Sequence, residues 1–530
     1  METIFFNGKI ITMENEPYTD CVLVKNGIIE ETGSFEKISA LYPSAQKRDL
    51  EGRALMPSFI DPHSHFMSAA ITLLYPSVSR CKTFDDIQRL IKEFVSLKNL
   101  DSEKWLVLRD FDQSVIKENA YPNKKILDEA APEIPVVLQH KSGHSGVFSS
   151  KALQILGIDA DTKSAEGGTI EIINGEPTGY MDENAYIKYI QKIPLPDSQS
   201  LQEAIKKTQN MYFSKGITTI QEGMLVKSMV PIYEKAMELK LFKADIVGFV
   251  GPNDIDSVKN VFSGHIKEYK NNFKIGGIKI FLDGSPQNKT AYMSRPYIDN
   301  KKNFGSLTMK NEEVLEALKK AVENDMQILC HCNGDKACDI FINCVNDISK
   351  IEPRICSLNP VIIHAQFINP AVLPFAASLG ITASFFVAHI LHWGELHIKN
   401  LGYNRASQMS PLNSALQCMP FTLHQDTPVI NPDMFETIYC AVSRKTSAGR
   451  VIGQNQKISV YNALKAVTIN AAKQYSEQNS KGSISKGKRA DLIILDKNPL
   501  EVSEDEIRNV NVIETIKDGE TVWKGEEQFL

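Results

Sequence analysis

Short β-type runs alternate with helix-type runs along most of the chain. The β-type runs are rich in branched and aromatic residues. In the intervals, apolar residues recur every three to four positions, as in 312–324, where Val314, Leu315, Leu318 and Val322 share one helical face. This alternation is typical of a parallel sheet whose strands are joined by crossover helices, so we expect an α/β fold.

Eight such runs occupy the middle of the chain. They are residues 55–61, 217–222, 244–250, 277–282, 327–331, 361–364, 381–386 and 421–426. Eight strands with helices between them predict a closed (β/α)8 barrel of the TIM type. We assign the barrel to residues 56–75 and 201–479.

The interval between the first and second runs is far longer than the few residues of an ordinary βα loop. We therefore expect residues 76–200 to form a long insertion after the first barrel strand. The catalytic ends of barrel strands lie on the side where such insertions emerge. The insertion is accordingly predicted to cover the active site.

Both ends of the chain carry further β-type runs. They are 3–12 and 21–32 at the start, and 491–495, 512–516 and 521–523 at the end. Lone strands at either end would leave apolar faces uncovered. We therefore predict one small β-sandwich domain built from both termini, residues 1–55 and 480–530.

Charge and composition exclude several classes of partner. The net charge is -5 without a long run of either sign, so no basic surface for nucleic acid or an anionic membrane is expected. The first residues lack the basic and apolar regions of a signal peptide, and nine cysteines without regular spacing do not suggest a disulfide framework. We expect a cytoplasmic protein that binds a small molecule.

Candidate metal ligands follow the predicted strands. His63 and His65 end the first run, and residues two apart on a strand point to the same side. His331, His364 and Asp426 end the fifth, sixth and eighth runs. Catalytic residues of barrels gather at these carboxyl ends, and imidazoles with a carboxylate are zinc ligands. An isolated His-x-His pair also occurs by chance, so the joint placement carries the prediction.

Lys279 lies inside the fourth run, GGIKIFLDG. A lysine within an apolar strand is costly unless its amine is paired or chemically changed. We therefore add Lys279 to the candidate site.

These motifs resemble the amidohydrolase superfamily, and within it the family 3 branch that contains the N-substituted formamide deformylases. The resemblance covers the whole chain and rests on residues 53–66 and on the blocks GIKIFLDGSPQNKTA, CHCNGDKA, IIHAQF, FTLHQDTPV and KGSISKGKRADLIILDKNP. Their order and spacing agree with the family as well as their residue types.

The resemblance implies a complete ligand set. His63 and His65 would bind a first divalent ion together with Asp426, and His331 and His364 would complete the site. Lys279 would be carboxylated on its amine, and the two oxygens of a lysine carbamate can bridge two ions. The expected cofactor is a divalent metal, zinc by preference, with one or two ions per chain.

The resemblance also implies a reaction. A metal-bound hydroxide would attack a carbon–nitrogen bond other than a peptide bond, in a formamide, an N-acyl amine or a cyclic amide, with Asp426 as general base. Deamination of an amino-substituted heterocycle is an alternative that the same residues could serve. A non-catalytic scaffold or regulator is another, although it predicts missing ligands and all six positions are present. Such barrels often pair, so a homodimer stays open.

Six further residues are weaker candidates for substrate binding. They are His144, Asp283, Ser285, His389, His392 and Arg405. His144 belongs to the insertion, where the family has a similar glycine–histidine segment. The alternatives are structural: a turn around Gly284, a loop packed on Trp393, and for Arg405 a surface charge.

Overall fold

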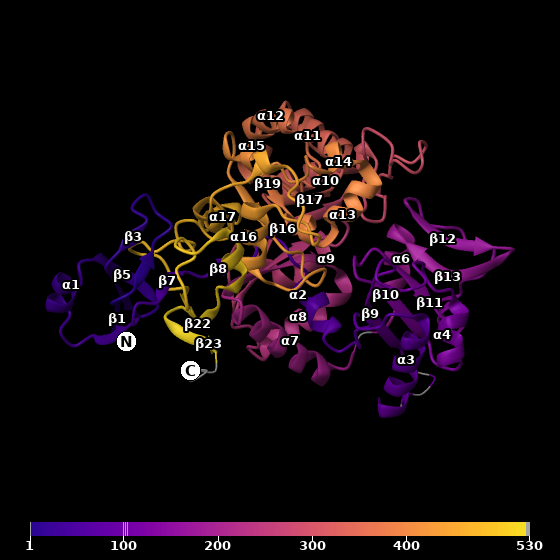
Figure 1. Cartoon of the computed structure of the whole chain (residues 1–530), viewed down its shortest axis with the longest axis horizontal. Coiled ribbons are helices and arrows are strands. Elements are labelled where there is room, and N and C mark those ends of the chain that lie inside the picture. The colour runs from indigo at the N-terminus through magenta and orange to yellow at the C-terminus, as the bar shows by residue number, and fades with distance from the viewer. Residues whose placement is uncertain (1, 99, 101, 103, 195, 526–530) are drawn as a thin grey trace. The chain divides into compact units, whose positions relative to one another are not determined.

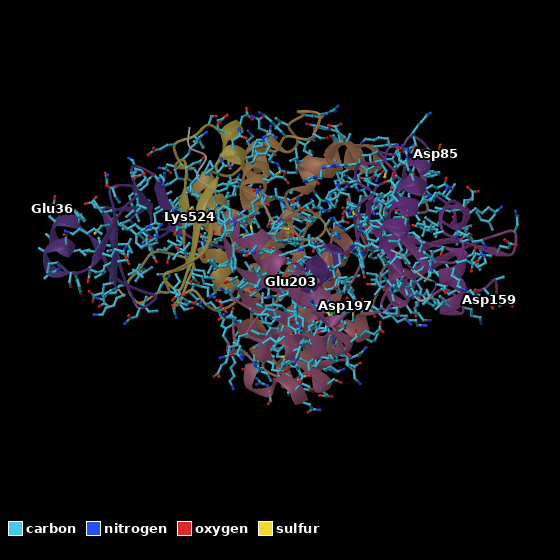
Figure 2. The ribbon with its side chains drawn as sticks, turned by 90° about the horizontal axis from the view of Figure 1, so that it is seen from below. Glu36, Asp85, Asp159, Asp197, Glu203 and Lys524 are labelled. Carbon is cyan, nitrogen blue, oxygen red and sulfur yellow. The ribbon has the colours of Figure 1, made fainter. Side chains whose placement is uncertain are left out.

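The computed structural model describes residues 2–98, 100, 102, 104–194 and 196–525. The chain divides into two compact units. The first comprises residues 1–67, 205–305 and 310–530, and the second comprises residues 68–204 with the short segment 306–309. Charged side chains such as Glu36 in the first unit and Asp85 and Asp159 in the second are exposed (Figure 2).

The first unit is built on a curled sheet of eight parallel strands in the order β20-β19-β18-β17-β16-β15-β14-β8. Figure 1 labels four of them, β8, β16, β17 and β19. The eight strands are β8 (Phe59–Ile60), β14 (Ile217–Leu225), β15 (Asp245–Val250), β16 (Phe273–Phe281), β17 (Gln327–Cys332), β18 (Val361–His364), β19 (Thr382–Phe385) and β20 (Phe421–Leu423). Such sheets are covered by helices on their outer face.

Backbone hydrogen bonds connect the segments that follow the two edge strands. The Asp426 amide donates to the carbonyl of His63 over 3.2 Å, and the His65 amide donates to the carbonyl of Thr427 over 2.8 Å. The sheet therefore curls far enough to bring the residues after β8 and β20 together.

Helices of the first unit occupy the intervals between the strands, and α10, α11 and α13 lie around β16, β17 and β19 in Figure 1. The helices are α1 (Phe35–Leu41), α7 (Ser198–Phe213), α8 (Val230–Glu238), α9 (Ile255–Phe262), α10 (Asn311–Glu323), α11 (Asp335–Ser349), α12 (Leu373–Ser378), α13 (His389–Leu401), α14 (Tyr403–Ala406), α15 (Leu412–Leu416), α16 (Met434–Ser443), α17 (Val460–Ala466) and α18 (Ile469–Gln474). Helices α2 (Phe66–Thr72) and α7 include the points where the chain passes between the units. In α10, Val314, Leu318 and Val322 are buried, as the apolar periodicity predicts.

The first predicted barrel run, 55–61, is wrong as a single strand. It divides into β7 (Ala54–Pro57), which pairs with β21 and β2 in another sheet, and β8 in the eight-strand sheet. The division falls at Ser58, whose amide donates to the carbonyl of Asp491, while the next amide, that of Phe59, donates to Gly216. The chain changes sheets between these two residues.

The terminal strands form two sheets with the orders β5-β4-β1-β6 and β23-β22-β21-β7-β2-β3. They are β1 (Glu2–Phe6), β2 (Lys9–Ile11), β3 (Tyr18–Thr19), β4 (Cys21–Lys25), β5 (Ile28–Gly33), β6 (Gln46–Asp49), β7, β21 (Leu492–Leu495), β22 (Val512–Lys517) and β23 (Glu520–Lys524). Val22, Leu55 and Leu492 share one buried core, so both ends of the chain contribute to the same packed region.

The second unit has its own sheet, in the order β12-β13-β11-β10-β9. Its strands and helices are α3 (Phe84–Lys98), β9 (Leu106–Phe111), α4 (Lys124–Ala130), β10 (Val136–His140), β11 (Ser145–Phe148), α5 (Ser150–Leu156), β12 (Gly168–Ile173), β13 (Glu176–Asp182) and α6 (Glu183–Ile190). The insertion that we predicted spans 76–200, and segment 306–309 was not foreseen. Among the described residues, no helix has the length and apolar character needed to cross a bilayer.

Candidate metal centre

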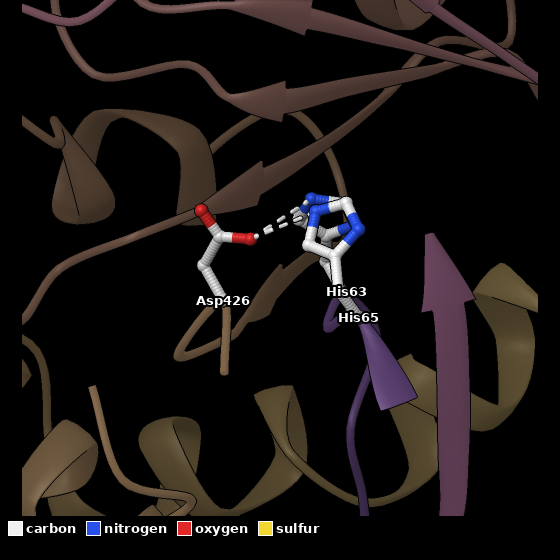
Figure 3. Close-up of side chains that lie close together, drawn as sticks. All are labelled: His63, His65 and Asp426. Atoms are coloured by element: carbon white, nitrogen blue, oxygen red, sulfur yellow. Dashed lines mark ion pairs between the residues drawn. The ribbon is translucent and has the colours of Figure 1, made fainter. Parts of the chain in front are cut away.

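Three predicted ligands meet where the segments after β8 and β20 are hydrogen bonded. Oδ1 of Asp426 lies 3.3 Å from Nε2 of His63 and 3.4 Å from Nε2 of His65 (Figure 3). One potential ligand atom from each residue lies within 4.8 Å of the others. His63 and Asp426 are buried and His65 is half-buried. The three side chains therefore converge from the two edges of the curled sheet.

His331 and His364 join this cluster from the ends of β17 and β18. Nδ1 of His331 lies 3.0 Å from Nε2 of His364, which is 3.8 Å from Oδ2 of Asp426. His364 and Asp426 have positive φ angles of 74° and 58°. Left-handed backbone in residues other than glycine is costly and concentrates at functional sites. The fold thus holds both side chains in place at some conformational cost.

Lys279 lies on β16 and reaches the same cluster. Its Nζ is 3.3 Å from Nε2 of His63 and 4.7 Å from the ring centre of Phe281. In the part of the chain that the structure describes, no carboxylate lies within 4.0 Å of this nitrogen. Burial lowers the pKa of Lys279 to about 8. All six predicted ligands are therefore gathered in one place.

The orientation of the His63 ring is fixed by Gln221 on β14. The Gln221 amide nitrogen donates to the carbonyl of Pro62 (2.7 Å) and to the Tyr475 hydroxyl (2.8 Å). Its oxygen must then face Nδ1 of His63, 2.6 Å away, and accept a hydrogen bond from it. This tautomer leaves the lone pair of His63 Nε2 directed at Asp426 and Lys279.

Two further acceptors lie behind the other histidine pair. Nε2 of His331 is 3.3 Å from the carbonyl of Gly284, and Nδ1 of His364 is 3.1 Å from Nε2 of His424. Hydrogen-bond acceptors of this kind orient metal-binding imidazoles. Sequence reasoning missed both Gln221 and His424. The position of His424, two residues before Asp426 on the same strand end, was the one available signal.

Burial sets the protonation of the cluster. It lowers the pKa values of His63 and His364 well below the usual value, so both imidazoles are uncharged at neutral pH. Burial by itself raises the pKa of Asp426, but the interaction with His65 leads the effects that outweigh burial and hold this pKa well below its usual range. Neutral imidazoles and an ionised carboxylate are the forms that bind metal ions.

These residues fit a divalent metal ion. Imidazole nitrogens and a carboxylate oxygen form the donor set that zinc prefers. Oδ1 of Asp426 is buried without a hydrogen bond of normal geometry in the described part of the chain. A buried carboxylate oxygen without a donor is costly unless a cation satisfies it. The cluster is therefore chemically suited to hold a metal.

Asp283 and Ser285 follow β16, near His331. The Asp283 carboxylate accepts hydrogen bonds from the amides of Asn333 (2.9 Å), Gly334 (2.8 Å) and Tyr292 (2.9 Å). These bonds fix the turns beside the cluster. The Ser285 hydroxyl is buried and has no partner among the described residues.

The candidates after β19 have protein partners. Nδ1 of His389 lies 3.1 Å from Nε2 of His397, and Nε2 of His392 lies 2.8 Å from Glu436. Arg405 donates to three backbone carbonyls, those of Leu401, Arg295 and Pro296. These bonds attach the segment around Pro296 to the end of α13.

His144 belongs to the second unit. Its Nδ1 lies 2.8 Å from a carboxylate oxygen of Glu183, which is buried. The carboxylate orients the imidazole by accepting the hydrogen on Nδ1.

Comparison with known proteins agrees with this geometry. The sequence model of the amidohydrolase family matches residues 46–523. The chain is 27% identical to a Bacillus subtilis (strain 168) protein named as amidohydrolase YtcJ, over 99% of this chain and 100% of that one. It is 26% identical to the N-substituted formamide deformylase of Arthrobacter pascens, over 98% and 97%. The crystal structure of an uncharacterized metal-dependent hydrolase from Pyrococcus horikoshii OT3 has the same fold, with a TM-score of 0.78, 22% identity, and coverage of 95% and 99%.

Proposed function

Because this chain belongs to the amidohydrolase family and is a metal-dependent hydrolase, we propose that it hydrolyses a carbon–nitrogen bond other than a peptide bond. The substrates we propose are formamides, N-acyl amines or cyclic amides. The family resemblance inferred from the sequence motifs and the prediction of a metal-dependent hydrolase are both confirmed. The substrate class is our own inference.

One observation carries the proposal: six potential ligands from five strands of one sheet converge on the same buried cluster. His63, His65 and Asp426 would hold one divalent ion, and His331 and His364 would complete the site, with zinc as the ion we propose. When bound, the ion lowers the pKa of water and polarises the substrate carbonyl. The proton transfers that the reaction requires are carried out by side chains of this chain.

We assign proton transfer to Asp426. Its Oδ1 faces the imidazoles of His63 and His65, so Oδ2 is the atom that we expect to accept the proton of the attacking water. The low pKa of Asp426 keeps the side chain ionised, which is the form that can accept this proton. Asp426 would then pass the proton to the leaving nitrogen as the carbon–nitrogen bond breaks.

We further propose that Lys279 is carboxylated. Its amine would add to carbon dioxide, forming a nitrogen–carbon bond and releasing one proton to solvent. The product is an anionic carbamate with two oxygens, which can bridge two metal ions. The burial of an amine without a nearby carboxylate supports this assignment, because the carbamate removes a costly buried cation.

The fold that we propose for this activity is a closed (β/α)8 barrel with a small terminal β-sandwich. The hydrogen bonds between the segments after β8 and β20 support closure of the sheet. The core shared by the two terminal sheets supports the sandwich.

Release of free amine tests the proposal. Zinc-loaded protein is incubated with a panel of formamides, N-acyl amines and cyclic amides, and new primary or secondary amine is measured. We expect turnover of at least one class, and turnover slower by at least about 10²-fold with an Asp426→Asn variant. Ammonia from amino-substituted heterocycles, with no hydrolysis of the panel, would instead establish the deaminase. No turnover in either assay would contradict the proposal.

A further inference from the structure

A row of three buried side chains crosses the adjacent strands β18, β19 and β20. Nδ1 of His364 lies 3.1 Å from Nε2 of His424, and Nδ1 of His424 lies 2.7 Å from Oγ of Ser384. His424 and Ser384 are fully buried, and His364 is 2% exposed. The row therefore has no access to bulk water.

The direction of these hydrogen bonds is coupled to metal binding. A neutral imidazole carries one hydrogen, so His364 can offer the lone pair of Nε2 only when its hydrogen is on Nδ1. That hydrogen must be accepted by Nε2 of His424. His424 then carries its own hydrogen on Nδ1 and donates it to Ser384.

The opposite direction of hydrogen bonding along the row would prevent His364 from binding a metal ion. If Ser384 donates to His424, then His424 donates to Nδ1 of His364. The hydrogen of His364 would then be on Nε2, facing Nδ1 of His331 at 3.0 Å. A protonated Nε2 has no lone pair for a metal ion. Only the direction that ends at Ser384 leaves the His364 ligand atom free.

His424 also packs against a second ligand. Its ring centre is 5.2 Å from that of His63 with an interplanar angle of 90°, and 5.1 Å from that of His364. One side chain thus contacts imidazoles that come from β8 and from β18. The same residue therefore packs against both rings.

We propose that His424, anchored by Ser384, is a positioning residue that sets the tautomer of His364 for metal binding. The inference rests on the proposed function, because it assumes that His364 is a ligand. Residues behind metal ligands commonly contribute about 10- to 100-fold to metal affinity. His424 is expected to act within this range.

Two substitutions of His424 separate hydrogen bonding from packing. His424→Phe fills the buried space but has no acceptor, whereas the Oε1 atom of His424→Gln can accept from His364. We expect the zinc affinity of H424F, measured by competition with a chromophoric chelator, to fall by about 10- to 100-fold. H424Q should recover most of this loss. His265→Gln, on a segment outside the cluster, is the matched control and should bind zinc as the wild type does.

Ser384→Ala tests the direction of the row even if H424F does not fold. It removes the acceptor for Nδ1 of His424 and should weaken zinc binding, while leaving the packing of both imidazoles unchanged. The visible spectrum of bound cobalt in S384A should shift, because the tautomer of His364, and with it the ligand atom offered to the metal, is no longer fixed by the row. Thermal unfolding of each metal-free variant shows whether it has folded.

The zinc affinities of the variants and of the wild type decide whether His424 has the proposed positioning role. If H424F or S384A is folded and binds zinc as tightly as the wild type, the positioning role is refuted. If H424Q loses as much affinity as H424F, packing alone explains the effect and the inference fails. If the wild-type protein itself does not bind zinc, the failure lies in the proposed function.

Discussion

Asp426 contacts three imidazoles through its two carboxylate oxygens. This position would allow one residue to hold a metal ion and to transfer a proton, as we propose. We predict that Asp426→Asn lowers kcat by at least about 10²- to 10⁴-fold, the usual contribution of a general base. The variant should keep part of its zinc, because the histidine ligands remain. Steady-state kinetics and zinc analysis of the same sample check both statements, and an active D426N would contradict the assignment.

A second prediction concerns the carboxylation of Lys279. After incubation with carbon-13-labelled bicarbonate, the wild-type protein should show a carbamate signal in its carbon-13 spectrum. Lys279→Met, which keeps the volume of the side chain but removes the amine, should lack this signal and have no activity. A fully active K279M would exclude Lys279 from the site.

The six candidate ligands could be proposed from the sequence because each lies in or at the end of a recognisable β-type run. The residues that orient the candidate ligands could not be identified from the sequence pattern. Gln221 orients His63 from a strand 158 positions further along the chain, and His424 contacts His364 across 60 positions. A hydrogen bond over such separations depends on strand order and side-chain direction, which the sequence pattern does not contain. The hydrogen bonds of Arg405 to backbone carbonyls were equally hidden.

Strand β14 passes close to the imidazoles of His63 and His65 at Gly223. A Cβ atom at this position would lie 2.9 Å from Cε1 of His63 and 3.0 Å from Cε1 of His65. Such contacts are far shorter than the ordinary separation of about 3.5–4.0 Å between carbon atoms. The strand can therefore pass beneath both imidazoles only with glycine.

We predict that Gly223→Ala displaces both rings and lowers zinc affinity by about 10-fold or more. The matched control is Gly251→Ala, whose new Cβ would meet the flexible end of Met224 at 3.1 Å. Chelator competition measures the affinities. Equal zinc binding by G223A and the wild type would show that the histidine positions tolerate this displacement.

Hydrophobic periodicity in the sequence locates most of the strands but does not show where the chain changes from one sheet to another. It located β14 to β20 because each is a buried apolar run bounded by turns or helices. The same pattern predicted β7 and β8 as one strand, because both are apolar and only Ser58 separates them. The change of sheet there depends on hydrogen bonds to Asp491 and Gly216, which are remote in sequence. Similarly, the first predicted run, 3–12, became β1 and β2 in different sheets.

Within the first unit, a buried ion cluster joins the amino end of β15 to the terminal strands. Asp245 contacts Lys481 (2.5 Å), Arg489 (2.7 Å) and Lys517 (3.0 Å). Burial raises the pKa of Asp245, but these three cations outweigh it and hold the pKa well below its usual value. The ionised carboxylate therefore contributes to stability at neutral pH.

We predict that Asp245→Asn lowers the free energy of unfolding by about 3–5 kcal/mol at pH 7, because it removes the carboxylate that contacts all three cations of this buried cluster. A carboxylate with a lowered pKa stabilises the fold above the pKa of the unfolded chain, about 4. The difference from the wild type should stay constant from about pH 7 to pH 5 and shrink below about pH 4. Urea unfolding across this range measures it. Asp505→Asn, at an exposed ion pair, is the control and should have little effect.

The association of both termini in one packed region could be inferred because apolar strands at both ends need partners. The position of the domain boundaries depends on long-range contacts. The second compact unit begins at residue 68 and includes 306–309, a segment that lies about 100 positions after the rest of that unit. Nothing in its composition marks this association.

Metal content per chain shows whether the cluster around His63, His65 and Asp426 is a metal site. Elemental mass spectrometry is applied to protein purified without added metal or chelator, and to a variant that carries His63→Ala and His65→Ala. We predict about one or two equivalents of a divalent ion in the wild type and a clear loss in the variant, with about two equivalents supporting a bridging Lys279. Wild-type protein that holds no divalent ion, even after incubation with zinc, would contradict this prediction.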